Sequence, residues 1–229
     1  MTKAPKESVC ALLEQGLREL GFPGEVQAAA RLAALSELVC DWGRQINLSG
    51  HRTPEAVATH LVLDAVALSA ALPPFDSLAD LGSGAGFPGL PIAILYPEVE
   101  VCLVEARMKR HHFQRAAVRA LSITNALPIH GRVEAVVPRA SQVAIAQAMG
   151  PAASVLDTIR PWARHDGWLA VPASPGSTPP SLETEQNERV RPAMSSTAPA
   201  LQEVTYVVPG GRLRKLWLVP VPLKLGPDA

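Results

Sequence analysis

The hydrophobic pattern of the chain first changes where the first third of the sequence ends. Before that point, apolar residues recur at helical spacing over residues 7–20 and 26–42, and Thr53 can cap a third helix over residues 54–71. We therefore expect residues 1–72 to form an N-terminal helical cap.

The next part of the chain alternates short apolar runs with amphipathic segments, which is typical of strand–turn–helix units. Such an alternation predicts an α/β fold with a parallel sheet and right-handed crossovers. The predicted strands cover residues 77–81, 100–105, 125–129, 142–146 and 168–171, and the predicted helices cover residues 86–95, 107–121 and 152–163.

The alternation stops in a segment rich in proline, serine and threonine. Residues 173–200 have the composition of a mobile loop. Two apolar runs, 203–208 and 214–221, flank a Pro-Gly-Gly turn and predict an antiparallel hairpin that closes the sheet. We assign residues 73–229 to one α/β domain.

The first predicted strand runs into the turn Asp80-Leu-Gly-Ser-Gly-Ala-Gly-Phe-Pro-Gly-Leu-Pro91. Its glycines lack a Cβ, so backbone amides can approach a ligand closely. From Gly84 onward the spacing also fits the dinucleotide fingerprint, in which amides at a helix N-terminus bind a pyrophosphate. The turn predicts a nucleotide cofactor, with candidate contacts from Gly82, Ser83, Gly84, Gly86 and Phe87.

Asp80 distinguishes between two kinds of nucleotide cofactor. A carboxylate repels a pyrophosphate, but it attracts the ammonium and sulfonium groups of S-adenosyl-L-methionine by roughly 1 to 4 kcal/mol at contact distance in a polar site. Because ligands of open parallel sheets bind beyond the carboxyl ends of the strands, we expect this cofactor beside Asp80.

A second acid, Glu105, ends the next predicted strand 19 residues after Gly86. A carboxylate at about this distance accepts both ribose hydroxyls in dinucleotide-binding folds. Ala106 is a neighbouring candidate contact, and Val133 and Glu134, after the third strand, are candidates to hold adenine. The alternative for Glu105 is a solvated carboxylate.

Composition narrows the class of protein further. The chain is 48% hydrophobic, has 21 basic and 21 acidic residues, and contains no uninterrupted apolar run of the length that spans a membrane. We expect a cytoplasmic protein with no membrane association and no overall electrostatic signature of a nucleic-acid binder. The three cysteines are far apart and His51 and His130 have no partner at ligand spacing, so we expect no metal site.

Residues 35–135 resemble the bacterial 16S ribosomal RNA guanine-N7 methyltransferases, the glucose-inhibited division protein B family. The glycine turn is similar to the family motif D-x-G-[ST]-G-x-G-x-P-G-[IL]-P, whose two prolines are uncommon among other methyltransferases. Further similar positions are Asn47, Leu48, Ser49, Arg52, Glu55, His60, Asp64, Glu105, Lys109, Arg110, Phe113, Arg132, Val133 and Glu134.

The resemblance implies a class I methyltransferase fold: a Rossmann-like, mostly parallel seven-stranded sheet with a C-terminal antiparallel hairpin and an N-terminal helical cap. It implies S-adenosyl-L-methionine as cofactor and a guanine of small-subunit ribosomal RNA as acceptor. On this basis Arg52 and His60 are candidates to position the substrate, and Lys109, Arg110 and Arg132 are candidates to contact RNA.

The chain departs from the family in its later half. The family carries basic residues after the fourth and fifth strands, where this sequence has Gln147 and Pro172. Gln147 is neutral and Pro172 has no backbone donor. Gln147 therefore stays a candidate to position the substrate, without the charge that the family uses toward RNA.

Guanine N7 has a free lone pair and no proton to lose, so alignment with the methyl group supplies most of the rate. The chain has no Asn-Pro-Pro-aromatic loop, which methylation of an amino group would use. It also has no cysteine in a catalytic loop, which attack on a pyrimidine would use. One alternative keeps the donor but methylates a small heteroaromatic, purine-like metabolite. Another is a non-catalytic scaffold protein, for which an eroded Asp80 or Gly84 would be expected.

Overall fold

The computed structural model describes residues 5–22, 26–147, 149–180 and 200–222. Seven strands form one sheet in the order β3-β2-β1-β4-β5-β7-β6. Strands β1 to β5 are parallel to one another, and β7 pairs antiparallel with β5 and with β6. The strands are β1 (Ser77–Leu81), β2 (Glu100–Glu105), β3 (Ala126–His130), β4 (Ser141–Ala146), β5 (Ala163–Ala173), β6 (Gln202–Val208) and β7 (Arg212–Pro220).

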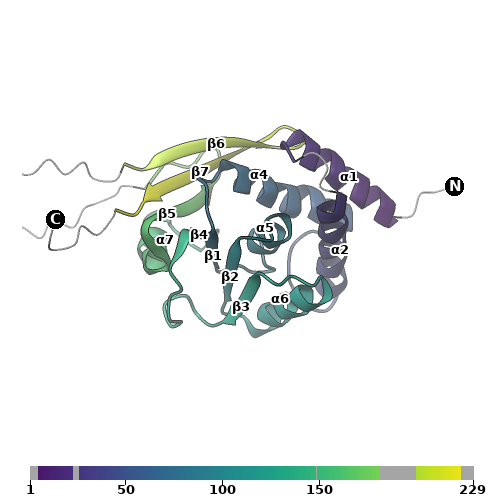
Figure 1. Cartoon of the computed structure of the whole chain (residues 1–229), viewed down its shortest axis with the longest axis horizontal. Coiled ribbons are helices and arrows are strands. Elements are labelled where there is room, and N and C mark those ends of the chain that lie inside the picture. Colours follow the sequence, from purple (N-terminus) through teal and green to yellow (C-terminus); the bar gives the residue numbers. More distant parts are fainter. Residues whose placement is uncertain (1–4, 23–25, 148, 181–199, 223–229) are drawn as a thin grey trace, which may run out of the picture.

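Helices cover both faces of this sheet, with α2, α5 and α6 on one side and α7 on the other (Figure 1). Side chains alternate along the strands, so Leu78 and Leu103 point into the first layer while Leu81 and Val104 point into the second. The helical elements are α1 (Pro5–Glu19), α2 (Val26–Gly43), α3 (Pro54–Val57), the π-helix η1 (Ala58–Val62), α4 (Leu63–Ala71), α5 (Gly89–Leu95), α6 (Met108–Ala120), α7 (Ala152–Ile159) and the 3-10 helix η2 (Arg160–Trp162).

The N-terminal helices and the α/β part share one hydrophobic core. Buried side chains of α1, α2 and α4, such as Leu13, Leu32 and Val66, belong to the same cluster as Ile92 of α5 and Phe113 of α6. The predicted domain boundary at residue 72 falls in the short loop between α4 and β1. Both of these elements contribute side chains to the shared core.

Three predicted helices differ from the observed ones. The helix expected over residues 152–163 ends at Ile159 and is followed by the 3-10 helix η2, and Ala163 already belongs to β5. The helix expected from residue 86 begins only at Gly89, because Gly86 has a positive φ of 81° and a cis peptide bond joins Phe87 to Pro88. The helix expected over residues 54–71 is continuous, but its middle turn, η1, has π geometry. Thr53 caps it as predicted, since its Oγ1 accepts the Ala56 amide at 3.2 Å.

The C-terminal part follows the predicted order with one longer strand. β5 starts at Ala163 rather than at residue 168, beside a register shift between Ser141 and Val143 of β4. β6 and β7 form the expected hairpin. Of the loop predicted over residues 173–200, residues 181–199 lie outside the described residues. Among the described helices, none is long and apolar enough to cross a membrane.

Candidate active site

The carboxyl ends of the parallel strands bring the predicted cofactor residues together. Leu81, the last residue of β1, pairs with Val104 of β2 and with Ala146 of β4, so the loops after these three strands meet at one edge. The glycine turn, which we call the glycine loop (residues 82–88), leaves β1 at this edge. The topology thus brings the loops that carry the predicted cofactor residues to one edge of the sheet.

The glycine loop needs residues without a side chain. Gly82, Gly84 and Gly86 have φ values of 70°, 58° and 81°, which are strained for any residue with a Cβ. A Cβ at Gly89 would clash with Leu103 and lie 2.9 Å from Asp80 Oδ2. The loop therefore turns tightly against β1 and β2, and its exposed or half-exposed residues Gly82 and Gly84 remain accessible to a ligand.

Asp80 lies beneath the glycine loop rather than open to solvent. It is 1% exposed, and its Oδ2 accepts the Gly89 amide at 2.8 Å, at the first residue of α5. Burial raises the pKa of Asp80 to about 7; the Gly89 bond opposes this rise and the charge of Glu105 adds to it. A positive ligand group above the loop would favour the ionised carboxylate.

Glu105 binds the backbone on both sides of the predicted cofactor site. Its Oε2 accepts the amide of Gly84 at 2.9 Å and its Oε1 accepts the amide of Arg107 at 2.6 Å. The side chain is 5% exposed, so the alternative of a solvated residue is wrong. Each carboxylate oxygen keeps a further lone pair, with which it can accept a hydroxyl.

Gln114 is a candidate site residue that the sequence analysis missed. It comes from α6, is 0% exposed, and its Nε2 donates to Ser83 Oγ at 2.8 Å and to the Gly84 carbonyl at 2.9 Å. Ser83 Oγ in turn donates to the Val104 carbonyl at 3.2 Å. A lone glutamine on a helix gives no signal in a sequence pattern, because its partners lie 30 residues away along the chain.

The segment after β3 begins at the same edge of the sheet, because His130 at the end of β3 pairs with Glu105. Val133 is buried, whereas Glu134 is exposed and ion-paired with Arg132 at 3.9 Å. Ala106 is exposed, and its carbonyl lies 3.1 Å from His130 Nε2. Of the two residues predicted to hold adenine, Val133 therefore presents an apolar surface and Glu134 faces solvent.

Residues of α6 and of the N-terminal cap lie beside the glycine loop. Arg110 Nη1 is 3.7 Å from where a Cβ of Gly84 would stand, and Arg110 Nε donates to the Asn47 carbonyl at 3.4 Å. Lys109 is exposed on the same turn of α6. Arg52 is exposed too, and its Nη1 donates to the Gly43 carbonyl at 3.1 Å.

Gln147 directly follows β4 and is exposed at the same edge. Met149, two residues later, packs against the loop, since its Sδ lies 2.8 Å from where a Cβ of Gly82 would stand. Phe87 is half-buried at the end of the loop. Pro172, by contrast, is part of β5 and pairs with Leu216, so it acts as a strand residue.

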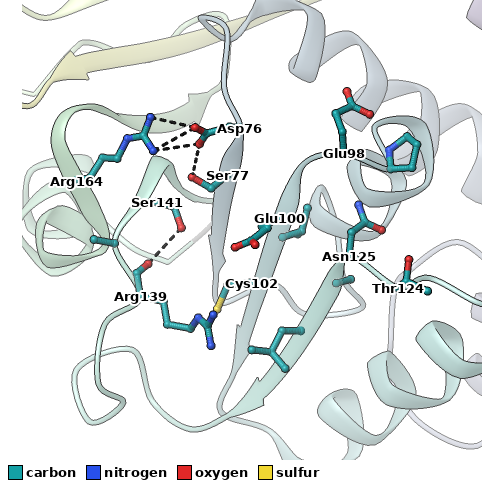
Figure 2. A pocket seen from close by; sticks show the side chains of 15 residues that line it. Asp76, Ser77, Glu98, Glu100, Cys102, Thr124, Asn125, Arg139, Ser141 and Arg164 are labelled. Carbon is teal, nitrogen blue, oxygen red and sulfur yellow. Dashed lines mark hydrogen bonds and ion pairs between the residues drawn. The ribbon is translucent and has the colours of Figure 1, made fainter.

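A polar cavity of about 1040 Å³ lies at the opposite edge, where the strands begin (Figure 2). Asp76, which directly precedes β1, Ser77 of β1, Glu100 of β2 and Ser141 of β4 line it, and Arg164 forms an ion pair with Asp76 at 3.2 Å. The cavity contains none of the predicted cofactor residues. We place the site at the carboxyl edge, because the glycine loop and both buried acids are there. In the described part of the chain, no group of His, Cys, Asp and Glu side chains is arranged to hold a metal ion.

The sheet order, the glycine loop and the acid at the end of β2 define a class I methyltransferase that uses S-adenosylmethionine. The chain belongs to the family described as rRNA small subunit methyltransferase G, which matches residues 28–179.

Curated relatives carry the name Ribosomal RNA small subunit methyltransferase G. The one from Chromohalobacter salexigens is 37% identical over 162 residues, which cover 70% of this chain and 77% of that protein. The one from Methylobacillus flagellatus is 36% identical and covers 69% and 78%, and the one from an Azoarcus species is 40% identical and covers 55% and 59%.

Solved structures support the fold alone. A putative O-methyltransferase from Klebsiella pneumoniae matches 95% of this chain and 99% of its own with a TM-score of 0.53 and 12% identity. A mutant of MtNAS matches 95% of this chain and 86% of its own, with a TM-score of 0.53 and 14% identity.

Proposed function

We propose that this protein transfers the methyl group of S-adenosylmethionine to N7 of a guanine in 16S ribosomal RNA. The observation that carries the proposal is the double backbone contact of Glu105, which joins the glycine loop to the start of α6 in a chain of this family. The acceptor follows from the relatives' name and from the motif resemblance. A ribosomal RNA substrate implies action in the cytoplasm.

The residues at the carboxyl edge fit the donor. The exposed backbone of Gly82 and Gly84 leaves room for its amino acid part, and Glu105 has lone pairs free for ribose hydroxyls. Val133 gives an apolar contact for adenine. When bound, the donor supplies an electrophilic methyl on a sulfonium sulfur. Asp80 lies under the loop as a negative charge in a buried setting, and it favours a cationic ligand.

Methylation of N7 requires the protein to align the guanine with the methyl group, and it does not require a general base. The N7 lone pair attacks the methyl carbon while the carbon–sulfur bond breaks, and the positive charge passes from sulfur to the purine. No proton leaves the base in this step. The chain must therefore hold the guanine in line and keep water out, which is positioning work.

We propose that the basic side of the site contacts the RNA backbone. Arg110 lies beside the glycine loop and Lys109 is exposed on the same turn of α6. Arg132 follows β3, and Arg52 belongs to the predicted cap, where it donates to the Gly43 carbonyl. Residues 1–72 would then act as the cap that covers the acceptor. Phosphate contacts of this kind weaken with salt, because binding releases counterions from the RNA.

A small heteroaromatic acceptor is the second candidate. Gln147, at the exposed edge, is neutral where the family has a basic residue, and Pro172 is built into β5. Both changes remove positive charge that would attract RNA. With a purine-like metabolite as acceptor, the cap would close over a small pocket instead of an RNA strand.

Mass analysis of 16S ribosomal RNA from cells with and without the gene tests the proposal. We expect one 7-methylguanosine to disappear when the gene is deleted and to return with a plasmid copy. A copy with Glu105→Ala should fail to restore it. An unchanged RNA, together with normal binding of S-adenosylhomocysteine by the purified protein, would favour the small-molecule acceptor.

A further inference from the structure

Two histidines and an arginine form a cluster that the proposed function has not used. The rings of His51 and His60 stack with centroids 4.8 Å apart and planes 16° apart. Arg212 Nη1 lies 2.8 Å from His60 Nδ1, and Arg212 Nη2 donates to the Thr59 carbonyl. His51 lies in the loop between α2 and α3, His60 lies in η1, and Arg212 is the first residue of β7.

The topology places this cluster at the carboxyl edge of the sheet. Ala173, at the carboxyl end of β5, pairs with Lys215 of antiparallel β7, so Arg212 lies beyond the end of β5. The cap segment that carries His51 also contacts Arg110, the residue that lies over Gly84, through the Asn47 carbonyl. The histidine pair is therefore on the same side of the sheet as the glycine loop.

The arginine determines which nitrogen of His60 carries the proton. A guanidinium has only donors, so the Nδ1 that it contacts must be the acceptor. His60 is then a neutral imidazole with its proton on Nε2. Burial, followed by the charges of Arg212, His51 and Arg214, lowers the pKa of His60, while Asp64 opposes this. Arg214 Nε is itself paired with Asp64 at 3.0 Å, whereas Arg212 contacts His60 directly.

We propose that this cluster selects guanine as the acceptor base: His60, stacked on His51 and held by Arg212, donates its Nε2–H to O6. The inference rests on the proposed function. Guanine shows two acceptors, N7 and O6, on this edge, whereas adenine shows N7 and an amino donor. A donor at His60 therefore accepts guanine, leaves N7 free and rejects adenine. A neutral donor also suits a base that becomes positive during the transfer, because an imidazolium would repel it.

Base replacement in the RNA tests this contact. We would prepare 16S ribosomal RNA with guanine, hypoxanthine or 2-aminopurine at the methylated position. Hypoxanthine keeps O6 and N7, and 2-aminopurine lacks O6. For the wild type we expect kcat/KM within about threefold for hypoxanthine and about tenfold lower for 2-aminopurine, the size of one hydrogen bond. In His60→Leu the two bases should be methylated equally, because the donor is gone.

Arg212 is a positioning residue in this account, and its test uses readouts that packing alone would not move. In Arg212→Gln the pKa of His60 should rise, so the acidic limb of kcat/KM should shift to higher pH. Arg139→Gln, at the opposite edge, is the matched control and should leave that limb in place. Nitrogen NMR of histidine-labelled wild-type protein should show His60 as the neutral Nε2–H form at pH 7.

The outcomes test separately the role of the cluster in choosing the base and the proposed function. An Nδ1–H form or an imidazolium at His60, or an equal 2-aminopurine penalty in the wild type and His60→Leu, would overturn the cluster's role in choosing the base. Wild-type protein that binds S-adenosylhomocysteine but methylates none of the RNAs would overturn the proposed function and the O6 contact together. The NMR result would then still report the tautomer.

Discussion

The two edges of the sheet use their carboxylates in different ways. At the carboxyl edge, Asp80 and Glu105 are buried and accept backbone amides of Gly89, Gly84 and Arg107. At the amino edge, Asp76 is half exposed and pairs with the Arg164 side chain, which ties β1 to β5 (Figure 2). A hydrogen bond from Ser77, with help from Arg164, lowers the pKa of Asp76, whereas burial raises that of Asp80.

The difference separates a ligand site from a structural contact. A carboxylate that accepts backbone amides fixes the shape of a loop, and a cationic ligand beside it would favour its ionised form. An ion pair between side chains neutralises itself and mainly joins two strands. The edge with fixed loops and uncompensated acids is therefore the one suited to a cationic nucleotide, although the opposite edge holds the cavity of about 1040 Å³.

Removing Glu105 should cause the largest loss of ligand affinity. Glu105→Ala takes away the acceptor of two amides, at 2.9 and 2.6 Å, that connect the glycine loop to α6. It also takes away the acceptor proposed for the ribose hydroxyls, and two hydrogen bonds from a ligand to a charged group are worth about 4 kcal/mol, or roughly a thousandfold in affinity. Calorimetric titration with S-adenosylhomocysteine measures the loss.

Asp76→Ala is the matched control at the amino edge. It removes a carboxylate from the same sheet but from the other end of β1, so the affinity for S-adenosylhomocysteine should stay within about twofold. Equal losses in the two variants would mean that the carboxylates serve only stability.

The second prediction concerns Asp80 and pH. Its folded pKa of about 7 lies above its ordinary value of 3.8, so its contribution to stability is complete below pH 4 and is lost as the pH rises to 7. Asp80→Asn keeps an acceptor for the Gly89 amide and does not titrate. Between pH 5 and 8 the ligand-free wild type should lose about 2 to 3 kcal/mol relative to this variant. Urea unfolding at each pH measures the difference, and parallel curves would refute the raised pKa.

The third prediction tests Gln114, whose side-chain amide donates to two residues of the glycine loop. Gln114→Leu removes the hydrogen bonds to Ser83 Oγ and to the Gly84 carbonyl. We expect three- to tenfold weaker binding of S-adenosylhomocysteine, about 1 kcal/mol. Gln142→Leu makes the same change at the amino edge, where Gln142 accepts from Arg164 at 2.7 Å, and should leave binding unaltered. Unchanged affinity in both variants would remove Gln114 from the site.

The smallest effect should come from the ion pair at the amino edge. Arg164 and Asp76 have side chains that are 37% and 65% exposed, so water screens their attraction. Asp76→Asn should lower the free energy of unfolding by about 0.5 kcal/mol, and less in high salt. A loss several times larger, measured by urea unfolding, would show that this edge stabilises the fold more than its exposure indicates.

The sequence predicted the parts of the fold that local patterns determine. The strands that end in Asp80-Leu81 and Glu105, the glycine turn and the C-terminal hairpin all follow from apolar runs and turn residues. The start of α5 at Gly89 and the length of β5 did not follow. Gly86 has a left-handed conformation that delays the start of the helix. β5 is longer than predicted because Ala163 pairs with Ser141 of β4 across a register shift, and Pro172 and Ala173 pair with β7.

The site was predictable where its residues lie in the motif and hidden where they meet from different elements. Glu105 could be placed by spacing, and its bond to Gly84 follows from two neighbouring strand ends. Gln114 and Arg212 could not, because their contacts to Ser83 and to His60 join residues 31 and 152 positions apart. Periodicity holds no information on such contacts.

Amide hydrogen exchange with and without S-adenosylhomocysteine tests most directly whether the donor binds at the carboxyl edge. We predict slower exchange in peptides that contain Gly84 and Arg107, whose amides Glu105 accepts, and no change in peptides around Asp76 and Arg164. Protection confined to the amino edge, or no protection at saturating ligand, would contradict the assignment of the site.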